Sequence, residues 1–377
     1  MFLHGEPRVK QGARVDVLGE SLGMTSQAAG FGARPDPGVP RSPSGGRRGL
    51  VLGAGGSLGA AWTIGALCAL EDAYGWDPRS ADVILGTSAG AIVGSALALG
   101  TRPCELRDHQ RGHAVAFGPL RGVRVDYDTW VGGGLPPLPK PGIGSLKLLR
   151  SMAGRPHRMP FTILLAAFAP PGRASLDGVR DVFRQLGMAD RWPTTAALRV
   201  VAVDVDTGTR VLFGTPDAPR TDLATAVTAS CALPAWFAPV EIDGRHYVDG
   251  CAWSDTNLDL LAGDGLDEVV VLAPTSARRT DRPRGLAARA ERRLRRVATG
   301  RLLREAQQVR DAGTRVRLIT PGPEDLAAMG PNLMDPLRRL TVLETSLRTT
   351  AAELRTPSPD QVATPPQAQG PTDRRPG

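Results

Sequence analysis

Val83-Ile84-Leu85-Gly86-Thr87-Ser88-Ala89-Gly90 is followed by a run of small residues from Ala91 to Leu99. An apolar strand, a sharp turn centred on one serine and then a helix form the context of a Gly-x-Ser-x-Gly nucleophile elbow. Gly86 and Gly90 lack a Cβ, so we expect them to let strand and helix approach closely while Ser88 stands out at the end of the sheet. Taken alone, the pentapeptide is equally compatible with an ordinary tight strand-to-helix turn.

A second strand-turn-helix unit precedes the elbow. The short apolar strand Gly49–Leu52 leads into a glycine-rich turn, Gly53–Gly59, and then into an apolar helix from Ala60 to about Tyr74. Backbone amides in such a turn can bind an anion. A dinucleotide fingerprint would need glycine where this chain has Leu58, and no Gly-Lys-Ser/Thr of a phosphate loop is present. The remaining interpretation is an oxyanion hole.

The two units should be adjacent in one parallel sheet. A right-handed crossover places both turns at the carboxyl ends of neighbouring strands, where ligands of open α/β sheets bind. Period-2 patterns and apolar runs predict further strands at 198–204, 209–213, 240–242, 246–249, 267–272 and 314–320. Helices are expected at 177–186, 222–230 and 336–354.

Asp249 ends the second strand of a predicted hairpin. Asp243-Gly244 separates two alternating runs, which is a strong hairpin signal, and Gly250 frees the backbone to turn directly after Asp249. The competing structural interpretation is that Asp249 only caps this turn.

Four ordered blocks of this sequence resemble the patatin-like phospholipases. The blocks are Gly55-Gly56-Ser57-Leu58-Gly59, Gly86-Thr87-Ser88-Ala89-Gly90, Ser230-Cys231-Ala232-Leu233-Pro234-Ala235-Trp236-Phe237-Ala238-Pro239 and Asp249-Gly250-Cys251. The resemblance implies an α/β fold, a three-layer α/β/α sandwich with a mostly parallel central sheet. It also implies hydrolysis of lipid acyl esters, phospholipid or lysophospholipid, by a Ser-Asp dyad without histidine, cofactor or metal.

The resemblance also implies roles for individual residues. Ser88 would be the nucleophile, Asp249 its base, and Gly86 and Gly90 the elbow glycines. The oxyanion hole would be formed by Gly55, Gly56, Ser57, Leu58 and Gly59. The chain departs from the family at Leu58, where many members have a basic residue, and at Trp62, where many have histidine. These two side chains would make the entrance of the site more apolar.

Two other functions fit the same sequence. A Ser-His-Asp esterase could use His246 with Asp204 or Asp222, in the order of the α/β-hydrolases. Strand alternation disfavours it, because His246 lies three residues from Asp249 and should face the other way. A catalytically silent member that binds lipid or a partner is the second alternative, motivated by Leu58.

One domain is expected at 48–355, between Gly-, Pro- and Arg-rich tails at 1–47 and 356–377 that are too polar to fold. Within it, 101–173 is interpreted as a variable insert or lid, with a core strand at 161–168 as the alternative. The four cysteines show no metal-type spacing, and neither a signal peptide nor a membrane span is evident. We therefore expect a cytoplasmic protein.

The positive charge is concentrated in one segment. Residues 278–317 hold fourteen arginines against four acidic residues, which exceeds the net charge of +8 of the whole chain. Apolar residues recur there at near-helical spacing and predict an amphipathic helix within 278–312: Leu286, Ala290, Leu294, Val297, Leu302, Ala306 and Val309. It is either a surface helix with a solvated basic face or a peripheral contact with anionic membranes. Nucleic acid is not expected, since no reading motif accompanies the arginines.

Overall fold

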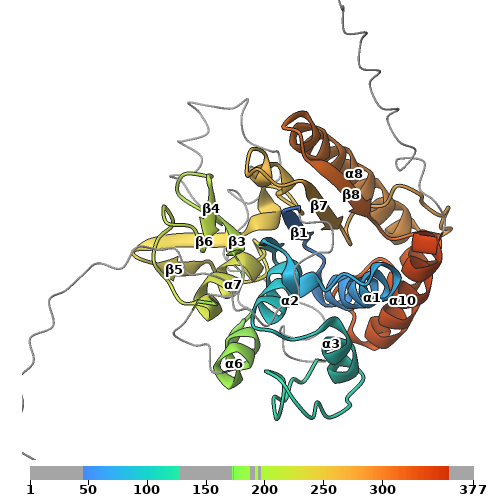
Figure 1. Ribbon diagram of the computed structural model, residues 1–377, viewed down its shortest axis with the longest axis horizontal. Coiled ribbons are helices and arrows are strands. Elements are labelled where there is room, and N and C mark those ends of the chain that lie inside the picture. Colours follow the sequence, from blue (N-terminus) through green and yellow to red (C-terminus); the bar gives the residue numbers. More distant parts are fainter. Residues whose placement is uncertain (1–45, 128–171, 173, 187–191, 194–196, 356–377) are drawn as a thin grey trace, which may run out of the picture. The chain divides into compact units, whose positions relative to one another are not determined.

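A computed structural model describes residues 46–127, 172, 174–186, 192–193 and 197–355. The predictions for the two tails, and for the insert or lid and its alternative strand between 128 and 171, lie outside the described residues. The family fold expected from the sequence is present in the described part, as a mixed α/β arrangement with a central sheet (Figure 1).

The sheet contains eight strands in the described part of the chain. They are β1 (Arg48–Leu52), β2 (Val83–Thr87), β3 (Ala197–Asp204), β4 (Arg210–Phe213), β5 (Val240–Ile242), β6 (Arg245–Asp249), β7 (Glu268–Leu272) and β8 (Arg315–Ile319). Their order is β5-β6-β3-β2-β1-β7-β8, with β4 also paired to β3. The pairs β1/β2, β1/β7, β2/β3 and β7/β8 are parallel, so the sheet is mostly parallel as predicted.

Strands β1 and β2 are adjacent, with Leu50 opposite Ile84 and Leu52 opposite Gly86. Both therefore end at the same edge of the sheet. The predicted hairpin is also present, because β5 and β6 pair antiparallel across Asp243-Gly244, and β6 pairs antiparallel with β3. Asp249 is thereby carried to the sheet edge where β2 ends.

The helices lie on both faces of the sheet. They are α1 (Gly56–Tyr74), α2 (Ala89–Ala98), α3 (Pro103–Gln110), α6 (Asp177–Gln185), α7 (Leu223–Cys231), α8 (Leu286–Asp311), α9 (Pro323–Met329) and α10 (Arg339–Arg355). Short 3-10 turns are η1 (Pro78–Ser80), η3 (Gly250–Ala252), η4 (Leu258–Leu261) and η5 (Pro336–Arg338).

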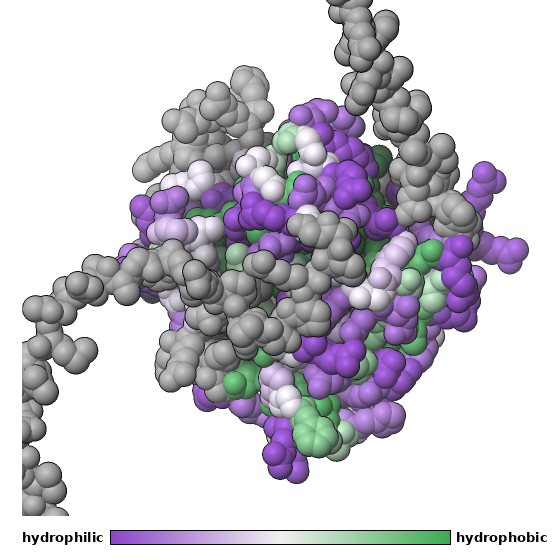
Figure 2. Space-filling view, in the orientation of Figure 1, coloured by the Kyte–Doolittle hydropathy of each residue, from purple (hydrophilic) through white to green (hydrophobic). Residues whose placement is uncertain are grey.

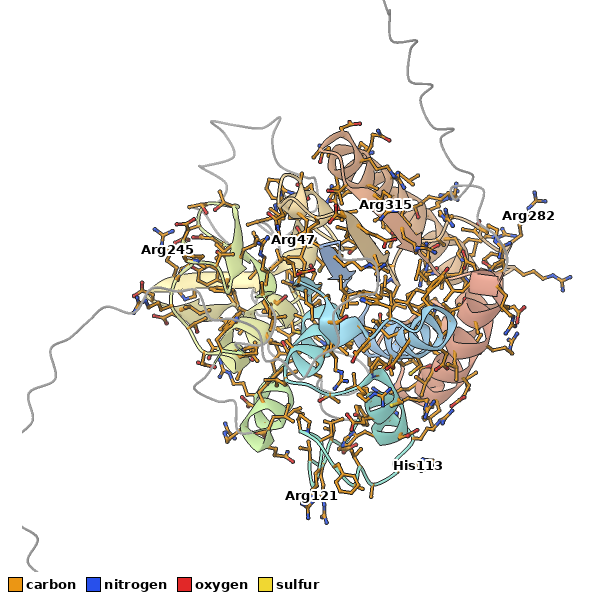
Figure 3. The ribbon with its side chains drawn as sticks, viewed as in Figure 1. Arg47, His113, Arg121, Arg245, Arg282 and Arg315 are labelled. Atoms are coloured by element: carbon orange, nitrogen blue, oxygen red, sulfur yellow. The ribbon has the colours of Figure 1, made fainter. Side chains whose placement is uncertain are left out.

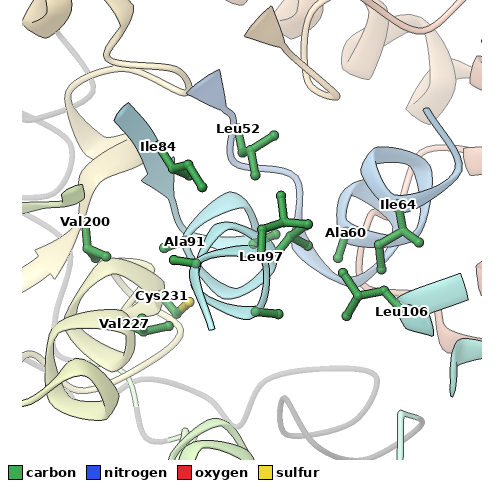
Figure 4. Packing of buried hydrophobic residues seen from close by; sticks show 14 of the residues in the cluster. Leu52, Ala60, Ile64, Ile84, Ala91, Leu97, Leu106, Val200, Val227 and Cys231 are labelled. Atoms are coloured by element: carbon green, nitrogen blue, oxygen red, sulfur yellow. The ribbon is translucent and has the colours of Figure 1, made fainter. Parts of the chain in front are cut away.

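Successive residues along a strand pack into two different hydrophobic clusters, one on each face of the sheet. Leu50, Leu52 and Ile84 face a cluster that includes α1, α2 and α7, and Figure 4 shows this packing around Ala91 and Leu97. Val51, Leu85 and Val271 face the opposite cluster, which includes α8 and η4. Since side chains alternate across a strand, this partition confirms the three-layer arrangement.

Helix α8 differs from the sequence expectation in its first half. Leu302, Ala306 and Val309 are buried, as the amphipathic pattern predicts, but Leu286, Leu294 and Val297 are exposed. Each residue advances about 100° around a helix, so the step of five residues from Val297 to Leu302 rotates the apolar stripe by roughly 140°. The amphipathic helix expected from the sequence is therefore present, but its seven apolar positions form two stripes, and only the second stripe is buried.

Within the described residues, no helix is both long enough and apolar enough to cross a membrane.

Candidate active site

Ser88 occupies a strained turn between β2 and α2. Its backbone angles, φ 55° and ψ −123°, place it in a region that L-residues rarely adopt. A Cβ on Gly90 would lie 2.0 Å from the carbonyl oxygen of Leu52, and one on Gly86 would lie 2.5 Å from the Cα of Ala91. Both glycines therefore permit the close approach of α2 to the sheet that the elbow pattern predicts.

A buried hydroxyl on α7 holds the elbow. The backbone N–H of Ser88 donates to Ser230 Oγ at 2.9 Å, and Ser230 Oγ donates to the carbonyl of Val201 at 2.6 Å. Ser230 was part of the resemblance, but its contact with position 88 spans 142 residues of sequence and cannot be read from local pattern.

Asp249 lies at the end of β6 and is only 1% exposed. Its backbone N–H donates to the carbonyl of Ala232, and its Oδ1 accepts from the N–H of Cys251 at 2.8 Å. Burial raises the pKa of the Asp249 carboxyl to about 7, against smaller lowering effects of the Cys251 amide and the neighbouring Ser88 side chain. Asp249 thus caps a turn and also lies beside Ser88.

The predicted glycine-rich turn belongs mainly to α1, which begins at Gly56 rather than at Ala60. The N–H of Leu58 donates to the carbonyl of Leu333 at 3.0 Å, and that of Gly59 donates to Gly55 at 2.8 Å. The amides of Gly55, Gly56 and Ser57 have no such partner among the described residues, and the first amides of a helix are unpaired by geometry. Of the five residues predicted for the oxyanion hole, Gly55, Gly56 and Ser57 thus keep an unpaired backbone amide, whereas the amides of Leu58 and Gly59 are already used.

Gly56 has φ +59°, and a Cβ there would lie 2.6 Å from Met334 Sδ, so this conformation requires glycine. The side chains of Leu58 and Trp62 are fully buried in the core between sheet and helices. The expectation that they make the entrance apolar was wrong, because α1 directs them inward.

The segment from Gly250 to Leu258 joins the three parts of the site. The carbonyl of Asp255 accepts from the N–H of Ala54 at 2.8 Å, beside the Gly56 turn. Asn257 Nδ2 donates to Thr87 Oγ1 at 3.2 Å and to the carbonyl of Gly250 at 3.4 Å. Asn257 is fully buried and was not expected from the sequence, since Thr87 is 170 residues away.

Glu305 on α8 anchors this segment. Its Oε2 accepts from Thr256 Oγ1 at 2.8 Å and from the N–H of Leu258 at 3.1 Å. Burial raises the pKa of the Glu305 carboxyl, and these hydrogen bonds partly offset the shift.

Ser88 and Asp249 line one cavity of about 540 Å³. Gly55, Gly56 and Ser57 also line it. Most of its remaining wall is apolar: Ala60, Ile92, Leu176, Leu233, Trp236, Phe237, Leu294, Ala298, Leu333 and Met334. The cavity thus offers a hydroxyl, a carboxyl group of raised pKa and unpaired amides within a largely apolar wall, a combination that suits an ester with a hydrocarbon chain.

The residues of the Ser-His-Asp alternative, His246, Asp204 and Asp222, do not line the cavity that holds Ser88. Of the histidines in the described residues, none lines the cavity, and His246 is exposed on β6 opposite Glu241. Asp222 caps α7 by accepting from the N–H of Thr225, and Asp204 accepts from the amides of Asp206 and Thr207. No group of three or more His, Cys, Asp or Glu in the described part of the chain is placed to hold a metal ion.

The fold is that of an α/β protein, and the cavity with Ser88 and Asp249 is the kind of site found in serine hydrolases. The chain belongs to the patatin-like phospholipase family, whose family model matches residues 50–262. That family and the resemblance of the four sequence blocks agree, and the protein is a lipid acyl hydrolase by class.

Two solved structures are distantly similar. VipD from Legionella pneumophila has 15% sequence identity over 84% of this chain and 69% of its own, with a TM-score of 0.38. The type III effector ExoU has 18% identity over 82% of this chain and 53% of its own, with a TM-score of 0.30. The chain thus spans about half the length of ExoU, which has also been solved with SpcU from the type III secretion system of Pseudomonas aeruginosa. The family assignment depends on the family model, not on these similarities.

Proposed function

We propose that the protein hydrolyses carboxylic ester bonds of phospholipids or lysophospholipids through an acyl-enzyme, with Ser88 as nucleophile and Asp249 as its base. The observation that supports this most is that both side chains line one apolar cavity together with the Gly56 turn.

Serine is a weak nucleophile at neutral pH and needs an adjacent base. A carboxyl group with a pKa of about 7 is suited to that task, because a base works best when its pKa lies near the working pH. In the proposed first step, Ser88 Oγ attacks the ester carbonyl, and Asp249 takes its proton and passes it to the leaving alcohol. Asp249 then takes a proton from water, which attacks the acyl carbon, and the bond from Ser88 Oγ to that carbon breaks; Asp249 returns the proton to Ser88 Oγ as the fatty acid leaves.

The amides of Gly55, Gly56 and Ser57 are the proposed oxyanion donors, at the positive N-terminal end of the 19-residue helix α1. One such donor is typically worth about 3 to 4 kcal/mol of barrier. Leucine in place of a basic residue at position 58 does not prevent this role. The N–H of Leu58 donates to Leu333 and its side chain is buried in the core, so both help to hold α1 in place.

The test combines covalent labelling with a lipid assay. A fluorophosphonate probe should label the wild type at Ser88 and should not label Ser88→Ala. Release of fatty acid from phosphatidylcholine and lysophosphatidylcholine should fall by about a thousandfold or more in Ser88→Ala and Asp249→Asn. His246→Gln is the matched control, and its activity should stay within about twofold of the wild type because the side chain is exposed.

Each alternative has its own outcome. Loss of activity in His246→Gln would favour the histidine triad. Absence of labelling in folded wild-type protein would favour a silent lipid- or partner-binding member.

The pH dependence of hydrolysis provides a further test. We expect kcat/KM to fall below about pH 7, since protonated Asp249 cannot accept the Ser88 proton.

Contact with an anionic membrane surface is part of the proposal. Such substrates lie in bilayers, and exposed arginines flank α8, among them Arg282, which points away from the body of the protein (Figure 3). Each basic residue near an anionic surface contributes about 1 kcal/mol to attraction.

A further inference from the structure

The first half of α8 carries an apolar stripe on its outer side. Leu286, Leu294 and Val297 are 81%, 71% and 67% exposed. Together with the exposed Ala290 they follow a spacing of four, four and three residues, which places them on one face of a helix. We name these four residues the α8 crest. Single exposed apolar residues need no explanation, but a continuous group of them marks an interaction surface.

The crest is held outward by buried charges on the opposite side of the helix. Arg292 and Arg295 are 4% and 3% exposed. Arg292 pairs with Asp281 at 2.5 Å and with Glu291, and Arg295 pairs with Glu291. Arg295 Nη1 also donates to the carbonyl of Pro274 at 2.5 Å. Rotating the crest inward would unpair these buried charges at high cost, so its exposure is fixed by the fold.

The crest borders the cavity that holds Ser88. Leu294 lines that cavity although most of its side chain is exposed, and Glu291, Arg295 and Ala298 on the same helix line it too. A surface that covers the crest therefore lies at the rim of the cavity.

Positive charge surrounds the crest. Six arginines in or next to the same helix are exposed: Arg282, Arg284, Arg289, Arg293, Arg296 and Arg304. Figure 2 shows hydrophobic areas set among hydrophilic ones on the visible face rather than one separate apolar face. Apolar residues flanked by arginines are the composition of helices that lie in the membrane interface, where apolar side chains enter the acyl boundary and basic ones meet lipid phosphates.

We propose that the α8 crest is the docking face for an anionic lipid bilayer, and that docking places the rim of the Ser88 cavity against the lipid. The crest supplies burial of apolar side chains, and the arginines supply attraction to anionic head groups. This inference rests on the proposed function in one respect, namely that the cavity receives a lipid chain from the bilayer.

The experiment separates docking from catalysis. Vesicle binding is measured in the full chain with Ser88→Ala, on phosphatidylcholine vesicles with and without phosphatidylglycerol. Hydrolysis is measured with active protein on the same vesicles and on a soluble short-chain ester. The docking variant is Leu286→Ser with Val297→Ser, neither of which lines the cavity. The matched control is Phe117→Ser, an 80% exposed apolar residue in the turns after α3.

The docking variant should lose about tenfold or more in binding to anionic vesicles and in vesicle hydrolysis, while its soluble-ester activity stays within about twofold. Phe117→Ser should behave like the wild type in all three assays. Arg289→Glu with Arg293→Glu should lose the preference for phosphatidylglycerol without changing soluble-ester hydrolysis.

Unchanged vesicle binding in the docking variant would overturn the proposal. So would a change in oligomeric state in place of a change in binding, since the crest would then contact another protein copy. Wild-type protein that binds vesicles through the crest but hydrolyses neither substrate would support docking while contradicting the proposed catalysis.

Discussion

The backbone amide of Ser88 donates to the hydroxyl of Ser230 at 2.9 Å, and the same hydroxyl donates to Val201 at 2.6 Å. One buried side chain thus ties the strained elbow to β3 and α7. The positive φ of Ser88 persists only if its surroundings hold it. Ser230 is therefore a positioning residue for the proposed nucleophile.

Replacing Ser230 with Ala should lower kcat by roughly tenfold to a hundredfold with little change in KM, because the Ser88 amide and the Val201 carbonyl lose their partner. Ser346→Ala is the matched control. Ser346 is also fully buried and donates to the carbonyl of Trp62 at 2.6 Å, away from the cavity. The control should lose about 1 kcal/mol of stability and keep its kcat. Equal effects of the two variants on kcat would contradict a positioning role.

Asn257→Asp should also lower kcat by about tenfold or more. The variant keeps the shape of the side chain but removes the amide donors that connect Thr87 Oγ1 with the carbonyl of Gly250. Thr87 and Gly250 adjoin Ser88 and Asp249 in the sequence, so the distance between Thr87 and Gly250 affects the geometry of the proposed proton transfer. The rate of fluorophosphonate labelling measures this effect directly. An unchanged labelling rate in folded Asn257→Asp would mean that Asn257 serves only the fold.

Local sequence patterns were sufficient to predict most of the strands and turns around the candidate site. The strand before Ser88, the elbow and the Asp243-Gly244 hairpin each depend on neighbouring residues, and all three are present. The start of α1 was misplaced by four residues, because the glycines of Gly55–Gly59 are typical of a turn, whereas in the structure the helix already begins at Gly56 and the N–H of Gly59 donates to Gly55.

The features of the site that could not be predicted from the sequence depend on long-range contacts. The hydrogen bonds from the Ser88 amide to Ser230 and from Asn257 to Thr87 join residues 142 and 170 positions apart. The orientation of α8 depends on buried ion pairs of Arg292 and Arg295, whereas arginine in an amphipathic pattern is ordinarily assigned to the solvent side.

Gly90→Ala and Gly300→Ala should change stability in opposite directions. The added methyl at 90 would lie 2.0 Å from the oxygen of Leu52, whereas the nearest atom to one at 300 is 3.8 Å away on Arg304. We expect the first change to cost more than about 3 kcal/mol or prevent folding. The second, inside α8, should stabilise the protein by about 0.5 to 1 kcal/mol. Urea unfolding measures both, and similar midpoints for the two variants would contradict this account of the elbow.

Asp249→Asn should stabilise the protein at high pH while abolishing hydrolysis. Burial raises the pKa of this carboxyl from 3.8 to about 7, so the folded state holds a proton that the unfolded state releases between those values. Stability from this group is therefore complete below about pH 4 and falls until pH passes about 7. Asparagine carries no charge, so its advantage over aspartate should be small near pH 4 and reach a few kcal/mol at pH 8.5. Thermal unfolding of both proteins across this range tests the claim. An equal gain at both ends would assign it to packing, and Asp249 would then lack the raised proton affinity that its proposed role as a base requires.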